Sequence, residues 1–328
     1  MVLSIKKIAI ITFALFVLVF IALWFLPESI TGHREDNLLL FVPKLLFLAV
    51  TAAIGIAFIL ILLFRRSYVK AQVETFNRFK YYLMLLIKRD FVTKYRKSIL
   101  GVLWSFLNPL LTMIVMTLVF SYLFRFDIEN FPVYLFSGLM IFNFFKESTT
   151  LAMSSVIVNE GVIKKIYIPK YMFPLSRVIS SLVNLSFSIV CFIFVIIFTG
   201  APIYWTIIMI PIPILFVFVF SLGVGMLLSA LAVFFRDLTY LYEVFTLLLM
   251  YFTPIFWPVI MLDPEGMLVN IIGLNPLFQF IFYFRDLALS GVIPDLWTTM
   301  VCVGYSLLAF CGGTFVFMKQ QDKYILSL

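Results

Sequence analysis

The chain has 328 residues, of which 64% are hydrophobic, 18% aromatic and only 12% charged. This composition excludes a soluble domain, which cannot bury so much apolar surface, and it predicts an all-α, polytopic membrane protein whose helices each need about 20 residues to cross the bilayer. The formal net charge of +8 does not indicate nucleic-acid binding, because most basic residues fall in segments that one membrane topology places together in the cytoplasm.

The N-terminal region, residues 1–66, is predicted to form two transmembrane helices. An apolar run at 8–26 follows two lysines and has the outline of a signal peptide, but it is long and lacks a small-residue cleavage site. We interpret it as a retained helix with a cytoplasmic N-terminus. A second helix at 38–64 returns to the cytoplasmic side and ends at Arg65 and Arg66.

Residues 67–98 are predicted to form an amphipathic helix at the cytoplasmic surface of the membrane. Its basic side chains would stay in water while its apolar face enters the interface; an anchor for anionic lipids is the alternative interpretation. The apolar face comprises Phe76, Phe79, Leu83, Leu86 and Ile87, and the opposite face Arg78, Lys88 and Arg89. Three residues break this pattern, namely Lys80, Leu85 and Asp90.

Residues 99–328 are predicted to hold six further spans, at approximately 99–124, 132–158, 175–198, 203–234, 238–258 and 296–318. Before the last span, the apolar pieces 267–274 and 277–289 are each too short to cross. Non-helical backbone survives at membrane depth only when it is buried in protein or faces a wet cavity. We therefore expect two re-entrant half-helices that enter from outside, and a cytoplasmic C-terminus after Lys319 and Lys323.

The sequence lacks the motifs of nucleotide-binding or catalytic proteins. It contains no GxxxxGK[ST] loop, so we expect no ATP or other cofactor in this chain, and it contains no HExxH or GxSxG motif. His33 is the only histidine, and Cys191, Cys302 and Cys311 lie in apolar runs, as is typical of small core residues. We therefore expect no metal site and no enzymatic activity.

One basic-to-apolar segment and several later motifs resemble a single transporter family. The segment is KRDFVTKYRKSILGVLWSFLNPL at 88–110, with matches at Arg89, Asp90, Tyr95, Ser98, Leu100, Gly101, Trp104, Asn108 and Pro109. The later motifs are Phe136-Ser137-Gly138, Asn143-Phe144-Phe145, the loop from Asn159 to Pro174, Phe235-Arg236-Asp237, Thr253-Pro254-Ile255, Asn275-Pro276 and Arg285. Together they cover about residues 75–328 and resemble type-2 ABC permeases that export cell-surface polysaccharides (O-antigen, capsule or teichoic acid).

The resemblance implies a six-helix permease in the bacterial plasma membrane, with a cytoplasmic interface helix and outer re-entrant half-helices. Two copies of the chain would form a homodimer, and two copies of a separate ABC ATPase subunit would bind ATP and magnesium below it. The cargo would be a polysaccharide linked to polyprenyl diphosphate. The chain departs from the family in its two extra N-terminal helices and in Lys146-Glu147, where relatives tend to have uncharged polar residues. Such a pair in a membrane helix faces the conduit or has a buried structural role.

The resemblance also implies three sets of site residues. The loop that carries ATPase motion into the membrane would use Asn159, Glu160, Lys164, Lys165, Tyr167 and Pro169, unless it is an ordinary positive-inside loop. The lipid diphosphate would bind Arg89, Lys94, Arg96 and Lys97, whose alternative partners are membrane-lipid headgroups. A glycan conduit, where aromatic faces stack against sugars, would use Trp104, Tyr134, Phe142, Phe144, Tyr251, Phe256 and Trp257.

Two other functions remain open at this point. The first is a type-2 ABC permease for another lipid or a drug, since the cargo is the least constrained part of the resemblance. The second is a membrane glycosyltransferase or ligase that acts on lipid-linked glycans. Such an enzyme needs catalytic groups in large outer loops, whereas the outer loops expected here are short.

Overall fold

The computed structural model describes residues 66–96, 100–123, 128, 130–258 and 271–324. Within these ranges every regular element is helical, which confirms the all-α prediction for this part of the chain. The two predicted N-terminal helices lie outside the described residues, as does the first half of the predicted half-helix 267–274; its described part is helical at 271–273.

The helices follow the predicted order, with bounds that shift by a few residues. The α-helices are α4 (Arg66–Tyr95), α5 (Trp104–Leu123), α6 (Phe131–Val158), α7 (Glu160–Ile163), α8 (Met172–Thr199), α9 (Pro211–Phe234), α10 (Leu238–Phe252), α12 (Pro276–Arg285) and α13 (Leu296–Gln320). Short 3-10 segments cover Gly101–Leu103, Trp205–Met209 and Gln321–Lys323, and a π-helical turn covers Asp286–Ser290.

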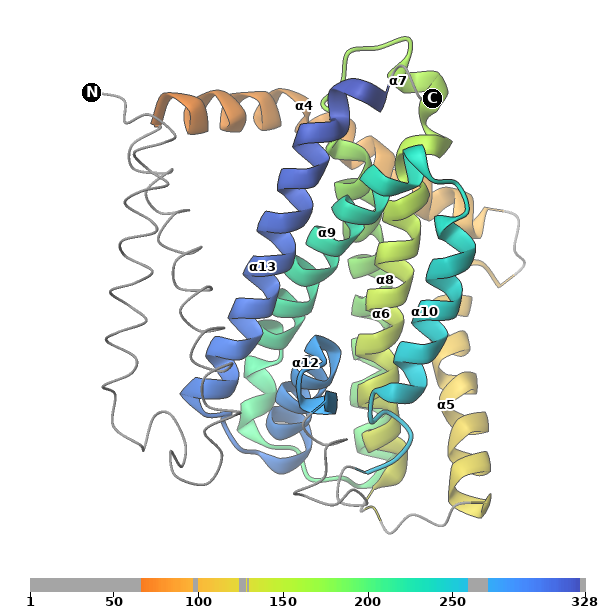
Figure 1. Ribbon diagram of the computed structural model, residues 1–328. Helices are drawn as coiled ribbons and strands as arrows, with labels where there is room; N and C mark the ends of the chain where they lie inside the picture. Colours follow the sequence, from red (N-terminus) through yellow and green to blue (C-terminus); the bar gives the residue numbers. More distant parts are fainter. Residues whose placement is uncertain (1–65, 97–99, 124–127, 129, 259–270, 325–328) are drawn as a thin grey trace, which may run out of the picture.

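Helices α6, α8, α9 and α13 form the body of the molecule (Figure 1). Helix α6 packs against both α8 and α9, and α9 packs against α13. Helix α4 lies across one end of this bundle, where α7 and the end of α13 are also found, whereas α12 lies toward the opposite end (Figure 1). The amphipathic segment and the predicted half-helix are therefore at opposite ends of the bundle.

Four of the described helical segments are long and apolar enough to cross a membrane. They are Gly101–Ser121, Met172–Thr199, Trp205–Phe234 and Leu296–Gln320. Helix α6 is also long, with 28 residues, but it carries Lys146, Glu147 and several hydroxyl side chains. Helix α10 has only 15 residues, which is fewer than the roughly 20 that a perpendicular span requires.

The prediction of a continuous helix over 238–258 is wrong at its C-terminal end. Helix α10 stops at Phe252, and Thr253 has an extended backbone with φ −84° and ψ 133°. The reason is Pro254, whose ring clashes with a helical conformation of the preceding residue. The predicted span at 203–234, which the sequence indicates is interrupted by Pro211 and Pro213, does divide there: α9 starts at Pro211, because a proline at the first helical position costs no hydrogen bond.

The amphipathic prediction for α4 holds for most of its apolar stripe. Leu83 and Leu86 are buried, and α4 packs against α8. Phe76, the first residue of the predicted stripe, is 39% exposed and is therefore not part of the buried core. Asp90, which breaks the stripe, lies at the contact because its carboxylate pairs with Arg177 of α8 at 3.0 Å.

Helices α9 and α13 touch through their backbones at two glycines. A Cβ atom added to Gly313 would lie 1.9 Å from the carbonyl oxygen of Gly223, and a Cβ added to Gly223 would lie 2.2 Å from the carbonyl carbon of Ala309. Small residues at such crossings let membrane helices approach closely and gain packing energy. The contact fixes α13 against the centre of the bundle.

Candidate substrate groove and coupling surface

Two cavities lie along one side of α6. The central cavity, of about 730 Å³, is lined by residues of α4, α5, α6 and α8. The α4 cavity, of about 820 Å³, is lined by residues of α4, α6 and α8. On α6, the residues that line both cavities are Glu147 and Leu151.

Together the two cavities follow most of the length of α6. The central cavity extends from Phe136 to Leu151, and the α4 cavity continues from Glu147 to Asn159 at the end of the helix. These 23 residue steps correspond to about 35 Å at 1.5 Å per residue, which is comparable to the roughly 30 Å hydrocarbon core of a bilayer. The cavities therefore form a groove of membrane-spanning length, called the α6 groove below.

Ten of the sixteen residues that line each cavity of the α6 groove have polar or charged side chains, among apolar ones. Polar side chains at membrane depth are costly and normally face protein or water. The central cavity is lined by Lys94, Ser105, Asn108, Thr112, Asn143, Lys146, Glu147, Thr150, Asn184 and Ser188. By contrast, the exposed face of α5 away from the groove carries Leu111, Ile114, Val115, Leu118 and Val119. Lys146 and Glu147 thus line the central cavity and are not buried in the protein core.

A carboxylate joins three helices where the two cavities overlap. Glu147 of α6 accepts hydrogen bonds from Lys94 Nζ of α4 at 3.0 Å and from Asn184 Nδ2 of α8 at 2.8 Å. Lys94 and Glu147 are 48% and 34% exposed, so both reach the space of the groove. Sequence analysis assigned no role to Asn184; an amide within an apolar run is the signal that would have indicated it.

A second set of polar contacts links α4 to the start of the predicted coupling loop. Arg89 Nη1 and Nη2 donate to Asn159 Oδ1 at 3.2 and 3.3 Å. Asn159 caps the end of α6, is buried, and donates to the Ser155 carbonyl oxygen at 2.7 Å. Asp90 holds the same turn of α4 on α8 through Arg177. The structure therefore brings together Arg89 and Asn159, which the sequence assigned to different sites.

The predicted coupling loop projects from the end of the molecule where α4 lies. Buried Ile163 and Ile168 anchor it, while Lys164, Lys165 and Tyr167 are exposed, Tyr167 to 93%. Within the loop, Glu160 pairs with Lys164 at 2.5 Å across one turn of α7, and Pro169 is half-buried. Lys170 donates to the Gln321 carbonyl oxygen, which ties the loop to the end of α13.

The predicted diphosphate-binding residues divide into two groups. Arg89 and Lys94 line the α4 cavity, whereas Arg96 is exposed and outside its lining, and Lys97 lies outside the described residues. Two further cations, Lys88 and Arg177, line the same cavity. Arg177 lies near the start of a strongly apolar helix, and a charged residue in such a helix could have indicated a site residue from the sequence.

The predicted conduit aromatics lie in different surroundings. Trp104 lines the central cavity, Tyr251 is exposed on α10, and Tyr134 and Trp257 are half-buried. Phe142, Phe144 and Phe256 are buried in the hydrophobic core of the chain. In the described conformation these three rings pack against protein and are not presented to the α6 groove.

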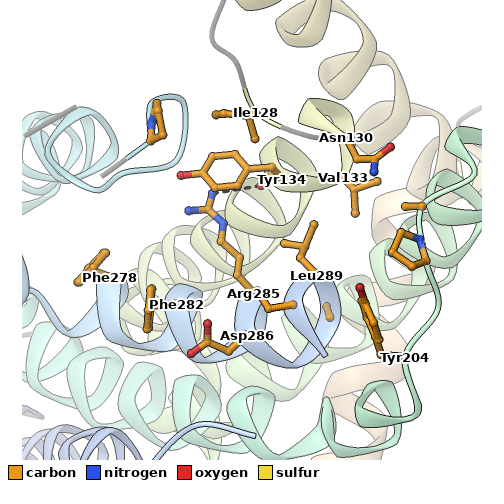
Figure 2. A pocket seen from close by; sticks show the side chains of 15 residues that line it. Ile128, Asn130, Val133, Tyr134, Tyr204, Phe278, Phe282, Arg285, Asp286 and Leu289 are labelled. Carbon is orange, nitrogen blue, oxygen red and sulfur yellow. Dashed lines mark hydrogen bonds between the residues drawn. The ribbon is translucent and has the colours of Figure 1, made fainter. Parts of the chain in front are cut away.

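Arg285 of α12 lies at the centre of a buried junction near the opposite end of the bundle. Its guanidinium donates to Ser137 Oγ at 3.2 Å and to the carbonyl oxygens of Pro254, Tyr134 and Ile255 at 2.8, 3.1 and 3.3 Å. Figure 2 shows this side chain reaching the ring of Tyr134, whose centroid is 3.5 Å from the guanidinium carbon. The sequence had placed Arg285 among the outside charges, but it is only 8% exposed.

The same junction brings together the motifs around Ser137, Pro254 and Asn275. Asn275 donates to Thr253 Oγ1 at 2.8 Å and accepts from the Leu277 amide at 3.0 Å, which caps the start of α12. A Cβ on Gly138 would lie 2.8 Å from Nη2 of Arg285, so glycine leaves room for the guanidinium. Motifs separated by more than a hundred residues therefore meet to hold α12 against α6. A cavity of about 450 Å³ adjoins the junction and is lined by Tyr134, Tyr204, Phe278, Phe282, Arg285 and Asp286, among others.

Comparison with known proteins relates the sequence of this chain to one family. The sequence model of the family described as "ABC-2 type transporter" matches residues 81–289. The O-antigen export system permease protein RfbA of Myxococcus xanthus is 26% identical over 256 residues, which cover 78% of this chain and 98% of that protein. Two proteins of the same name from Klebsiella pneumoniae are 32% and 30% identical over 243 residues, covering 74% of this chain and 93% of each relative. The chain is therefore a member of the ABC-2 type transporter family.

Proposed function

We propose that this chain is the transmembrane subunit of an ATP-driven exporter that carries a polyprenyl-diphosphate-linked polysaccharide across the bacterial plasma membrane. The observation that carries the proposal is the similarity to O-antigen export permeases over almost their full length. This similarity favours O-antigen over capsule or teichoic acid as the cargo. The polar α6 groove, which is as long as a bilayer is thick, supports a transport function.

The proposed topology places α4, α7 and the end of α13 in the cytoplasm. They share one end of the bundle, and α4 and the loop after α6 carry most of the exposed basic residues there (Figure 1). The π-turn and α12 then enter from the outer side as a re-entrant half-helix. In this division, residues 1–66 form the N-terminal extension, 67–98 the interface helix and 99–328 the six-span permease domain, with both termini cytoplasmic.

The α4 cavity is proposed to receive the lipid-linked end of the cargo. Lys88, Arg89, Lys94 and Arg177 supply positive charge for a diphosphate. Met84, Ile87, Val158 and Val183 supply apolar surface for the first isoprene units. Arg96 and Lys97 remain predicted contacts for the diphosphate or for membrane-lipid headgroups.

The central cavity is proposed to conduct the sugar chain. Its hydroxyl and amide side chains can exchange hydrogen bonds with sugar hydroxyls, and Trp104 offers an aromatic face against which sugars stack. A second copy of the chain would complete the conduit. Two copies of a separate ABC ATPase, which bind ATP and magnesium, would drive it through the loop from Asn159 to Pro169.

The coupling role can be tested with the double variant Lys165→Ala/Tyr167→Ala. Exposed tyrosines are frequent anchors of interfaces and contribute about 2 kcal/mol or more when they are buried by a partner. We expect the double variant to bind the partner ATPase at least tenfold more weakly, as about 1.4 kcal/mol implies, and to lose ATP-driven export. Co-purification with the ATPase and export assays in proteoliposomes measure these effects.

The matched control is Tyr81→Ala, because Tyr81 of α4 is also highly exposed but lies outside the loop. This variant should retain ATPase binding. Wild-type ATPase binding and export by the double variant would contradict the proposed coupling role.

A further inference from the structure

The ion pair between Lys94 and Glu147 occupies the boundary between the two cavities of the α6 groove. Both residues line both cavities, as do Leu151 and Asn184. Lys146, the neighbour of Glu147, lines only the central cavity, whereas Lys88, Arg89 and Arg177 line only the α4 cavity. The carboxylate thus lies between one group of cations on the α4 side and a further cation on the central side.

We propose that Lys94 and Glu147 form a gate between the two cavities, which an anionic diphosphate headgroup opens by taking Lys94 away from Glu147. This inference rests on the proposed function, because it assumes that the α4 cavity binds the diphosphate end of the cargo. It adds a specific role for a carboxylate: Glu147 competes with the cargo for Lys94, so the headgroup must bind Lys94 more strongly than Glu147 does before it can enter the central cavity. Lys146 provides the next positive charge, on the central-cavity side of the Lys94–Glu147 pair.

The geometry suits a reversible exchange of partners. A pair in which both side chains are about a third to a half exposed contributes little to stability, because water screens it, so a headgroup with several negative charges can replace the carboxylate. Lys94 Nζ is already within a cavity lined by other cations, where such a headgroup would be held. After the exchange, Glu147 keeps its hydrogen bond from Asn184, so the carboxylate is not left without a partner.

Contacts other than the Lys94–Glu147 pair also hold α4 on the bundle. Arg89 bonds to Asn159, and Asp90 pairs with Arg177, and neither contact involves Glu147. A Glu147→Gln substitution keeps an oxygen that can accept from Lys94 and Asn184, while it removes the negative charge. The variant therefore tests competition for Lys94 with little change in packing.

The test measures binding of a fluorescent polyprenyl diphosphate to the exporter, assembled with its ATPase in lipid nanodiscs. We expect Glu147→Gln to tighten binding about two- to fivefold, the factor that corresponds to losing an exposed ion pair as competitor. Lys94→Gln should weaken binding by at least a similar factor. In the Lys94→Gln background, the added Glu147→Gln change should lose most of its effect, because no lysine remains to be released.

Glu243→Gln is the matched control, since Glu243 is an exposed carboxylate on α10 outside the lining of both cavities. This variant should bind the probe like the wild type. Thermal unfolding of each variant verifies that it is folded. If Glu147→Gln leaves binding unchanged or weaker while Lys94→Gln weakens it, the gate is refuted and the headgroup site stands. If neither substitution alters binding, the headgroup site in the proposed function fails together with the gate.

Discussion

Replacing Gly313 with alanine is expected to destabilise the protein severely, because the new methyl group would collide with backbone. The added Cβ would lie 1.9 Å from the carbonyl oxygen and 2.7 Å from the carbonyl carbon of Gly223. No side-chain rotation can relieve this contact, so α9 and α13 must separate. Overpacking of this kind costs about 1–3 kcal/mol and occasionally more, and here a whole helix pair loses its packing. We expect a large fall in the yield and melting temperature of the detergent-purified protein.

The neighbouring residue supplies a matched control for this prediction. Gly312 lies on the same helix, and a Cβ added there would meet no atom within 4 Å. Gly312→Ala should therefore keep or slightly raise the melting temperature, because alanine is the better helix former by about 1 kcal/mol. If the two variants have equal melting temperatures, the close backbone contact between α9 and α13 at Gly313 is contradicted.

Replacing Arg285 with methionine is expected to loosen the junction that holds α12. The substitution keeps much of the side-chain volume but removes the donors for Ser137 Oγ and for three backbone carbonyl groups. A buried polar group left without a partner costs about 1–3 kcal/mol. Ser137 Oγ and the Tyr134 carbonyl oxygen keep the bond between them, so we expect the loss to come mainly from the Pro254 and Ile255 carbonyl groups. We expect a strongly lowered melting temperature and faster proteolysis within residues 253–290.

Arg285→Lys should recover only part of this loss, because one ammonium group cannot reproduce the planar, multiply bonded guanidinium. Arg236→Met is the control, since Arg236 is an exposed arginine and its loss should leave the melting temperature nearly unchanged. A melting temperature for Arg285→Met equal to that of Arg236→Met would mean that the buried junction does not contribute to stability.

The helices in the described part of the chain were largely predictable, because hydrophobic length is a local property of the sequence. The early end of α10 was also predictable in principle, since Pro254 excludes a helical Thr253. The buried environment of Arg285 could not be predicted from the sequence. An arginine beside a short apolar piece fits an outer loop equally well, and only the meeting of Ser137, Pro254 and Arg285 in space explains its burial.

The site shows the same division between local and long-range information. The motif around Arg89 and the loop at Asn159 were each identified from the sequence, but nothing in either segment indicated that the two side chains bond to one another. The predicted conduit aromatics show a second difficulty, which is that aromatic residues are too frequent in this chain to be informative. Because 18% of the residues are aromatic, the position of a ring in a motif does not tell whether it faces a groove, as Trp104 does, or the core, as Phe142 does.

The most direct test of the account asks whether cargo passes along the α6 groove. A photo-reactive residue is placed at Asn143, which lines the central cavity, or at Leu118, which lies on the exposed apolar face of α5. Each variant is reconstituted with its ATPase and a labelled lipid-linked polysaccharide, and is irradiated with and without ATP. We expect ATP-dependent cross-linking of the polysaccharide at position 143 and none at 118. Active export without cross-linking at 143, or with equal cross-linking at 118, would contradict the account.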